Sequence, residues 1–225
     1  MSYDGVIFDL DGTLINSLED IANAANATLR RYDLNPHPVD SYRYFIGDGL
    51  QTLIERIIPQ LHQDLEFVTM LMATFKELYS AGWHNKSSLY EGIGSMLNSL
   101  EAKGIKLAVF SNKPHHFTEL FVERFFPATT FAYVQGQVSG LAKKPDPAGA
   151  VMIAKQLRLR EERMVFVGDT AIDIETGSRA GMKTIGVEWG FRDRLELEKS
   201  GADKIVQRPR EVADYVLESK DDRLV

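Results

Sequence analysis

Two pairs of aspartates in this sequence follow apolar stretches with the length of buried strands. Asp9 and Asp11 end the stretch VIFDLDG, and Asp169 and Asp173 follow the stretch VFVG. Two carboxylates about 4 Å apart repel each other by about 4 kcal/mol at an effective dielectric near 20. A cation relieves this repulsion, and an all-oxygen set of ligands favours Mg²⁺ over zinc or copper. The acidic pairs therefore indicate a magnesium site, provided that the fold brings them together.

The spacing of the first pair excludes an EF-hand calcium loop but leaves an ordinary turn open. A calcium loop that began at Asp9 would need an acid and then a glycine where the chain has Thr13 and Leu14. Asp-Gly sequences favour turns, so a turn without chemistry is the alternative for this pair. For Asp169 and Asp173 the alternative is a helix N-cap, where Asp accepts hydrogen bonds from free N–H groups.

Two further segments carry groups that can hold a phosphate. Ser111 ends the apolar stretch LAVFSNKP with a hydroxyl, and Asn112 follows it. Lys143 and Lys144 precede a proline in LAKKPDP, and prolines restrict the backbone and so the direction in which a lysine points. The alternatives are a strand-end turn for the serine and a solvated loop for the lysines. Together the four segments supply a nucleophile, an acid/base, cation ligands and phosphate donors, which phosphoryl transfer requires.

These residues can act together only if a parallel sheet brings the ends of their strands to one edge. Continuous apolar runs predict buried strands at Val6–Leu10, Lys106–Ser111, Phe131–Val134, Met164–Gly168, Thr184–Val187 and Lys204–Val206. Helical patterns that close on glycine lie between several of these runs, which is typical of an α/β fold with a mostly parallel sheet. Ligands of such sheets bind beyond the carboxyl ends of the strands. We therefore expect Asp9, Asp11 and Asp169 to converge.

The alternation of strands and helices breaks between residues 17 and 83. This region holds amphipathic helical spacing at 18–34, 48–58 and 64–82 and no convincing strand. It is too long to be a simple crossover between two strands. We therefore predict a helical cap domain over residues 17–83, inserted into an α/β catalytic core formed by residues 1–16 and 84–225.

Composition limits the classes of function. The chain has 225 residues, a net charge of −6 and an isoelectric point near 5.4, which argues against a general binder of nucleic acid or anionic membranes. It has no cysteine, which excludes disulfides, thiolate catalysis and cysteine zinc sites. Without a long apolar run or a signal-peptide pattern, a cytoplasmic location is expected. The composition is compatible with a monomer or a dimer.

In chain order, the motifs resemble the four signature motifs of the haloacid dehalogenase superfamily. The matching residues are Asp9–Asp11–Gly12–Thr13, Ser111, Lys144, and Gly168–Asp169 with Asp173. The helical block after the first motif resembles a C1-type cap, so the resemblance covers nearly the whole chain. More narrowly, the segments DLDGTLINSLEDIANAANATL, YFIGDGL, FSNKP and KKPDPAGAVMIA resemble the phosphoglycolate phosphatase branch. The fold that this implies is a Rossmann-like parallel sheet core with an inserted helical cap.

The resemblance implies a Mg²⁺-dependent phosphatase that works through an aspartyl-phosphate. Asp9 would attack phosphorus. Asp11 would protonate the leaving oxygen and then activate water. The carboxylates of Asp9 and Asp169 and the backbone carbonyl of Asp11 would hold the metal, and Asp173 would support them.

The resemblance also implies how the substrate is held. Ser111, the Asn112 backbone and Lys144 would bind the phosphate, with Lys144 preferred to Lys143 because it directly precedes the proline. The cap would close over the leaving group and select the substrate. Candidate contacts in the cap are Phe45, Gly47 and Asp48, for which a helix-breaking turn is the alternative. The implied substrate is a small phosphorylated metabolite, with 2-phosphoglycolate as the first candidate.

Other activities remain open. They are nucleotide or pyrophosphate hydrolysis, a phosphomutase, and a non-catalytic phosphoacceptor module such as a response-regulator receiver. A mutase usually takes help from cap residues, and the first predicted cap helix has no histidine. Receivers are shorter and lack the large helical insert. Asp11 argues against a dehalogenase, because that reaction has no leaving oxygen to protonate.

Overall fold

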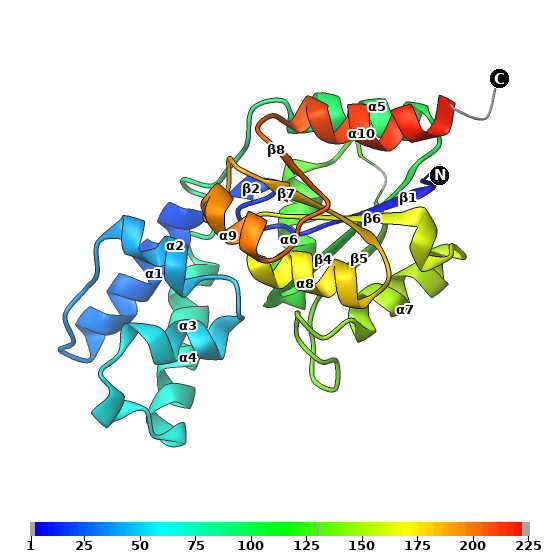
Figure 1. The fold of residues 1–225 in the computed structure, drawn as a ribbon. Helices are drawn as coiled ribbons and strands as arrows, with labels where there is room; N and C mark the ends of the chain where they lie inside the picture. The colour runs from blue at the N-terminus through cyan, green and yellow to red at the C-terminus, as the bar shows by residue number, and fades with distance from the viewer. Residues whose placement is uncertain (1–2, 130, 222–225) are drawn as a thin grey trace.

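The computed structural model describes residues 3–129 and 131–221 and shows an α/β core beside a helical body (Figure 1). Six parallel strands form the core sheet in the order β5-β4-β1-β6-β7-β8. Their bounds are β1 (Gly5–Phe8), β4 (Lys106–Pro114), β5 (Phe131–Gln137), β6 (Met164–Gly168), β7 (Lys183–Val187) and β8 (Lys204–Val206). All six predicted strands are therefore confirmed, with shifts at their ends.

Strand β1 ends earlier than predicted, and this releases the aspartates from the sheet. The Asp9 N–H still donates to the Val167 carbonyl at 2.9 Å, but the chain then turns. The carbonyl of Leu10, predicted as the last strand residue, accepts from the N–H groups of Leu14 and Ile15, both at 3.0 Å. A carbonyl used in this way closes a turn, so Asp9 ends the extended segment and the residues after Leu10 fold back over the sheet edge.

Helices cover both faces of the sheet, which explains why the strands are continuous apolar runs. One face carries Val6 and Phe8 and packs against α5, α6 and α10, whereas the other carries Ile7 and packs against α7 and α8. The core helices are α5 (Ile93–Ala102), α6 (His115–Phe125), α7 (Ala148–Leu157), α8 (Ala171–Arg179), α9 (Arg194–Lys199) and α10 (Pro209–Asp221). With α9 beside β8, they form two layers around the sheet (Figure 1).

The helical body lies between two short strands that pair antiparallel, β2 (Ile15–Asn16) and β3 (Ser88–Leu89). Its helices are α1 (Leu18–Arg31), α2 (Tyr42–Phe45), α3 (Leu50–Ile57) and α4 (Leu65–Ser80), and it has 3₁₀ turns at Val39–Ser41 and Gln60–His62. A further 3₁₀ turn, Glu161–Arg163, precedes β6 in the core. Each predicted helical segment contains an observed helix. The β2–β3 pair was not predicted, because two residues are too few to show a period. We keep residues 17–83 as the proposed extent of the cap.

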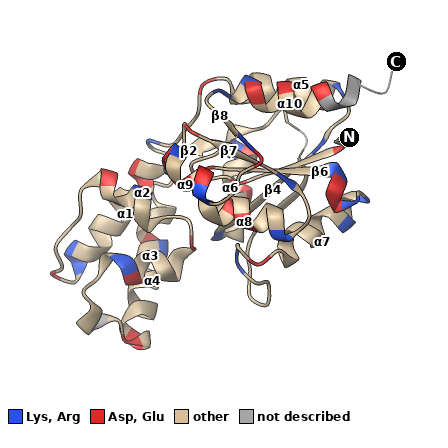
Figure 2. Cartoon of the chain, viewed as in Figure 1, with Lys and Arg blue, Asp and Glu red and all other residues tan. Residues whose placement is uncertain are grey.

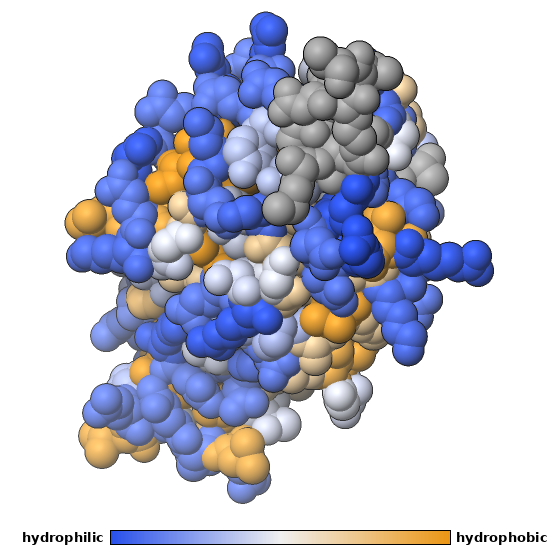
Figure 3. Space-filling model, turned by 45° about the vertical axis from the view of Figure 1, so that its right-hand side comes forward, coloured by the Kyte–Doolittle hydropathy of each residue, from blue (hydrophilic) through white to orange (hydrophobic). Residues whose placement is uncertain are grey.

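The surface carries both signs of charge. Figure 2 shows basic and acidic residues interspersed along the helices of the core, and Figure 3 shows small hydrophobic areas separated by hydrophilic side chains on the face that it draws. Leu61 and Leu65, at the N-terminal side of α4, are among the exposed large hydrophobic residues. Within the described parts of the chain, no helix combines the length and apolar character needed to cross a membrane.

Candidate active site

Three neighbouring strands in the middle of the sheet bring predicted site residues together. Strand β1 lies between β4 and β6 and pairs in parallel with both. Asp9 and Asp169 directly follow β1 and β6, and Ser111 lies near the carboxyl end of β4; all three are buried. This edge is where ligands bind in open α/β sheets.

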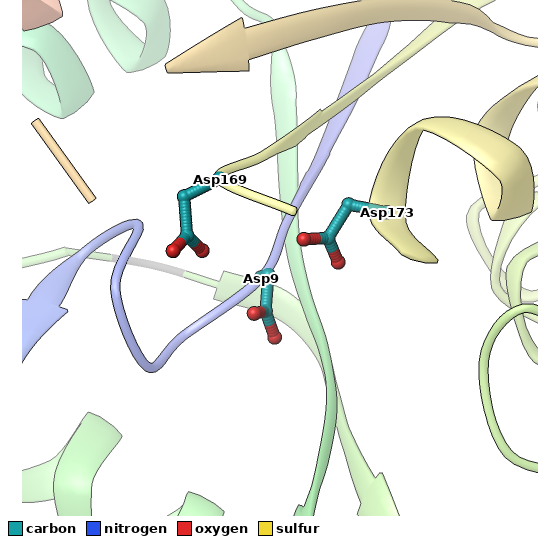
Figure 4. A group of neighbouring side chains, drawn as sticks. All are labelled: Asp9, Asp169 and Asp173. Atoms are coloured by element: carbon teal, nitrogen blue, oxygen red, sulfur yellow. The ribbon is translucent and has the colours of Figure 1, made fainter. Parts of the chain in front are cut away.

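The carboxylates of Asp9, Asp169 and Asp173 form a buried acidic cluster. Figure 4 shows Asp169, which follows β6, and Asp173, from α8, on either side of Asp9. One oxygen of each residue lies within 4.8 Å of those of the other two. Asp169 accepts hydrogen bonds from the Thr13 hydroxyl at 3.0 Å and the Phe191 N–H at 2.7 Å. Burial, followed by the charges of Asp173 and Asp9, raises the pKa of Asp169 well above its ordinary value.

Lys144 supplies a positive charge to this cluster. Its ammonium lies 2.6 Å from Asp173 Oδ1 and 2.8 Å from Asp9 Oδ1. Burial lowers the pKa of Lys144, but the charges of Asp173 and Asp9 outweigh it and raise the pKa overall. For Asp9, burial dominates and raises the pKa to about 6, although Lys144 acts in the opposite sense. One ammonium among three carboxylates leaves an excess of buried negative charge.

The acidic cluster fits a divalent cation. Asp9 Oδ1 is close enough to Lys144 for an ion pair, but no described donor lies in a hydrogen-bonding direction from it. A buried charged oxygen without a hydrogen bond is costly unless a metal or another cation compensates it. The free lone pairs of Asp9, the oxygen-only donor set and the excess of negative charge suit a hard cation such as Mg²⁺.

Asp173 is both a helix-capping residue and a member of the acidic cluster, the two interpretations that the sequence left open. Thr170 is the N-cap of α8, and its N–H and hydroxyl donate to Asp173 Oδ2 at 3.1 and 2.8 Å, which completes a capping box. The other oxygen of Asp173 accepts from Lys144 at 2.6 Å. Asp173 is therefore a capping residue that also orients Lys144, whereas Asp169 precedes the N-cap and is not itself a cap.

Asp11 turns away from the acidic cluster. Its carboxylate accepts from the Ser17 hydroxyl at 2.6 Å and from the Lys113 ammonium, which is 3.1 Å from both oxygens. Lys113 also donates to the Tyr79 hydroxyl at 2.9 Å. No role was predicted for Ser17, Lys113 or Tyr79 from the sequence. The continuation of β4 beyond Ser111 buries Lys113, so the length of this strand is a feature that could have identified Lys113. No local feature of the sequence identifies Tyr79 in α4.

The Asn112 side chain joins three segments at the site. Its oxygen accepts from the Lys144 N–H at 2.9 Å, and its amide nitrogen donates to the carbonyls of Lys144 at 3.1 Å and of Gly47 at 2.9 Å. It therefore holds the lysine loop and a turn of the cap against the end of β4. Lys143 is exposed and donates to the Asp48 carbonyl at 2.9 Å, so Lys144, and not Lys143, reaches the acidic cluster.

The predicted specificity residues of the cap lie in different places. Gly47 lines the same pocket as Asp9 and Asp11. Phe45 instead packs edge-on against His37 inside the cap, and the Asp48 carboxylate pairs with Arg56 at 2.6 Å. Phe45 and Asp48 do not line this pocket, and their role in substrate selection stays a proposal.

The pocket lies between the acidic edge of the core and the cap and has a volume of about 60 Å³. Its core wall is polar at Asp9, Asp11, Ser111, Asn112 and Lys113 and apolar at Pro114, Phe117 and Phe191. Its cap wall is mostly apolar and includes Ile21, Ile46, Leu50, Leu53, Phe75 and Tyr79. The pocket thus combines a polar part, which includes two aspartates and a lysine, with a largely apolar remainder.

Gly12 is required where the turn after β1 passes Asp169. Its φ is 87°, and a Cβ atom there would lie 2.3 Å from Asp169 Oδ2. A left-handed conformation costs a non-glycine residue about 1–2 kcal/mol. We expect Gly12→Ala to lower the free energy of unfolding by roughly 2–4 kcal/mol, since a clash with a buried carboxylate adds to this cost. Urea unfolding measures the change.

A matched control for Gly12 is available at Gly140. Its φ is 85°, and no described atom lies within 4 Å of the position that its Cβ would occupy. Gly140→Ala therefore carries the backbone cost without the clash, and we expect a loss of only about 1–2 kcal/mol. Equal losses in the two variants would show that contact with Asp169 contributes nothing.

Comparison with known proteins reveals relatives that match nearly the whole chain. Residues 6–187 match the family model of haloacid dehalogenase-like hydrolases. The chain is 31% identical over 220 residues to a phosphoglycolate phosphatase of Psychrobacter arcticus, covering 95% of this chain and 96% of the relative. It is 32% identical over 207 residues to a phosphoglycolate phosphatase of Aquifex aeolicus, covering 92% and 93%.

Solved structures are similar over the core and the helical body together. A predicted phosphoglycolate phosphatase from Haemophilus somnus superposes with a TM-score of 0.88 at 27% identity and covers 96% of this chain and 98% of its own. A predicted phosphatase from Clostridium acetobutylicum superposes with a TM-score of 0.87 at 27% identity and covers 97% and 100%. The α/β sheet with inserted helices is therefore a shared architecture.

Proposed function

The chain belongs to the haloacid dehalogenase-like hydrolase family and is a phosphoric monoester hydrolase, and from this premise we propose that it acts on a small metabolite through an aspartyl-phosphate on Asp9. The observation that carries the proposal is the position of the Asp9 carboxylate. It lines the pocket, follows β1 directly, and lies beside Lys144 and the acidic cluster. A nucleophile at this position can meet a phosphate in the pocket, while Lys144 and a cation in the acidic cluster would neutralise the charge of the phosphate.

In the proposed reaction Asp9 and Asp11 divide the work. An Asp9 oxygen forms a bond to phosphorus while the bond from phosphorus to the leaving oxygen breaks, and Asp11 gives that oxygen a proton. Asp11 then takes a proton from water as the water oxygen attacks phosphorus, which releases inorganic phosphate and restores Asp9. Asp11 lines the same pocket as Asp9, which supports this division.

The remaining groups would hold the phosphate and the metal. We assign Ser111, the Asn112 backbone and Lys144 to the phosphate. We assign Asp9, Asp169 and the Asp11 carbonyl to Mg²⁺, with Asp173 in support through its bond to Lys144. When bound, Mg²⁺ would neutralise phosphate oxygens and the excess charge of the acidic cluster.

We take 2-phosphoglycolate as the first candidate substrate. The relatives named as phosphoglycolate phosphatases support it, and so does the size of the pocket. A volume of about 60 Å³ is room for a few water-sized groups, since one water needs about 10–15 Å³ in this measure. That favours a small ester over a nucleotide. Pyrophosphate hydrolysis and phosphomutase activity are the competing proposals, and the cytoplasmic location stays a prediction.

The test is phosphate release from a panel of monoesters, nucleotides and pyrophosphate with Mg²⁺ present. We expect many turnovers per chain and the highest kcat/KM for 2-phosphoglycolate. Chelation should stop release, and added Mg²⁺ should restore it. A single slow event per chain would indicate a phosphoacceptor module, and a different preferred ester would retire phosphoglycolate while leaving the phosphatase activity in place.

A further inference from the structure

We propose that Lys113 recognises the carboxylate of a substrate such as 2-phosphoglycolate, in which the carboxylate lies close to the ester oxygen. This inference rests on the proposed phosphatase function and deepens it. It gives Lys113 a substrate-selecting role on the basis of its position in the fold.

Lys113 is the only cationic residue among the described residues that line the pocket. It reaches the pocket from β4, two residues beyond Ser111, and its side chain is buried. Lys144 lies deeper, between Asp9 and Asp173, and does not line this space. The two lysines are therefore available to different parts of a substrate, with Lys144 at the phosphate and Lys113 beyond it.

The surroundings of Lys113 hold its ammonium in place largely through aromatic faces. The nitrogen lies 4.6 Å from the centre of the Phe121 ring and 4.8 Å from that of Tyr79. Such faces attract a cation without neutralising it. Burial, followed by the charges of Asp11 and Asp20, raises the pKa of Tyr79 well above its ordinary value, so its hydroxyl remains neutral. Asp11 is consequently the anion that balances Lys113 in this state.

Catalysis removes that balance. Both Asp11 oxygens are 3.1 Å from the Lys113 nitrogen, so the carboxylate cannot stay in this arrangement and also turn to the leaving oxygen. When Asp11 turns to the leaving oxygen, Lys113 loses this partner in a pocket whose cap wall is mostly apolar. An unpaired buried charge is costly, so the site favours a substrate that brings an anion to this position.

The distances also restrict where that anion sits on the substrate. Asp11 must reach the ester oxygen, and Lys113 lies within hydrogen-bond distance of Asp11. A group bound to Lys113 is therefore close to the ester oxygen. A carboxylate attached to the carbon that carries the ester oxygen meets this condition, whereas one at the end of a long chain does not. The chemistry that fits is the phosphate ester of a 2-hydroxy acid.

The experiment compares two esters that differ in this group, 2-phosphoglycolate and 2-hydroxyethyl phosphate. For the wild type we expect kcat/KM to favour the carboxylate ester by roughly 30-fold or more, the loss typical of leaving a buried charge unpaired. In Lys113→Met the ratio should fall toward one, mainly through a higher KM for 2-phosphoglycolate. Lys143→Met, which removes a positive charge outside the pocket, should keep the wild-type ratio.

Three outcomes separate this inference from the proposed function. A wild-type ratio near one overturns the role of Lys113, whatever its variants do. An unchanged ratio in Lys113→Met, with equal losses on both esters, also overturns it and would show that Lys113 acts only by positioning Asp11. Failure of the wild type to release phosphate from any ester would instead contradict the phosphatase proposal itself.

Discussion

Asp9→Asn should lower steady-state phosphate release by roughly 10⁴-fold or more, the scale on which loss of a nucleophile acts in enzymes with covalent intermediates. An amide oxygen is a poor nucleophile toward phosphorus. The substitution also removes one of the three charges of the acidic cluster, so Mg²⁺ affinity should fall. The measurement is phosphate release, with intact mass after acid quenching to detect the phosphoryl group on the protein.

A matched control for Asp9→Asn is Asp64→Asn. Asp64 is the exposed N-cap of α4, and asparagine caps helices equally well, so this variant should behave as the wild type. The wild type should carry a phosphoryl group after the quench and Asp9→Asn should not. Equal turnover of wild type and Asp9→Asn, or an equal mass shift in both, would contradict the assignment of Asp9 as the nucleophile.

Folding of Asp9→Asn can be checked through the pH dependence of its stability. Burial raises the pKa of Asp9 from 3.8 to about 6 in the folded protein without metal. Between these values the folded state binds more protons than the unfolded state, so the stability due to this group falls as the pH rises through the interval. Asp9→Asn should lack that fall, and above pH 6 its metal-free form should be at least as stable as the wild type.

The strands and the acidic edge could be predicted because their signals are local. Apolar runs bounded by polar residues located β1, β4 and β6, and the order of a parallel α/β sheet brings their ends together whatever the details of packing. The ends of strands are less certain, because a strand continues as long as a neighbour offers partners. β4 extends to Pro114 beside β5, and this extension buries Asn112 and Lys113.

The cap residues were harder to predict, because several contacts between the cap and the core run through backbone carbonyls of the cap. The carbonyl of Ile46 accepts from Arg192 at 3.0 Å, and those of Gly47 and Asp48 accept from Asn112 and Lys143. The side-chain types in a sequence do not indicate which backbone carbonyl oxygens face a neighbouring domain. The motif YFIGDGL therefore lies in a segment that meets the core, and the side chains of Phe45 and Asp48 contact His37 and Arg56 within the cap.

The contact between Lys113, which pairs with Asp11, and Tyr79 shows the same limit. The two residues lie 34 positions apart in the chain, on β4 and α4, and each is unremarkable within its own segment. Hydrophobic periodicity indicates the buried face of a helix or strand. It does not indicate which polar groups on the buried faces of two elements contact each other. The roles of such pairs become visible only after the cap is folded against the core.

Asp11→Asn should separate acid/base chemistry from metal binding. Loss of a general acid/base typically costs about 10²–10⁴-fold in rate, and we expect a steady-state loss of that size. Mg²⁺ affinity should stay within a few-fold of the wild type, because the Asp11 carboxylate faces Ser17 and Lys113 and not the acidic cluster. Calorimetric titration with Mg²⁺ measures the affinity.

The choice of substrate sharpens the test of Asp11→Asn. An aryl phosphate has a leaving group that departs without protonation, so the first step should still proceed and phosphorylated Asp9 should accumulate, since no base activates water for the second step. Acid quenching should then show more phosphorylated protein in Asp11→Asn than in the wild type. Ser17→Ala is the matched control, because it removes the 2.6 Å hydrogen bond to Asp11 while keeping the carboxylate. Complete loss of Mg²⁺ binding in Asp11→Asn would contradict the division of roles, because it would mean that the Asp11 side chain, and not only its backbone oxygen, holds the metal.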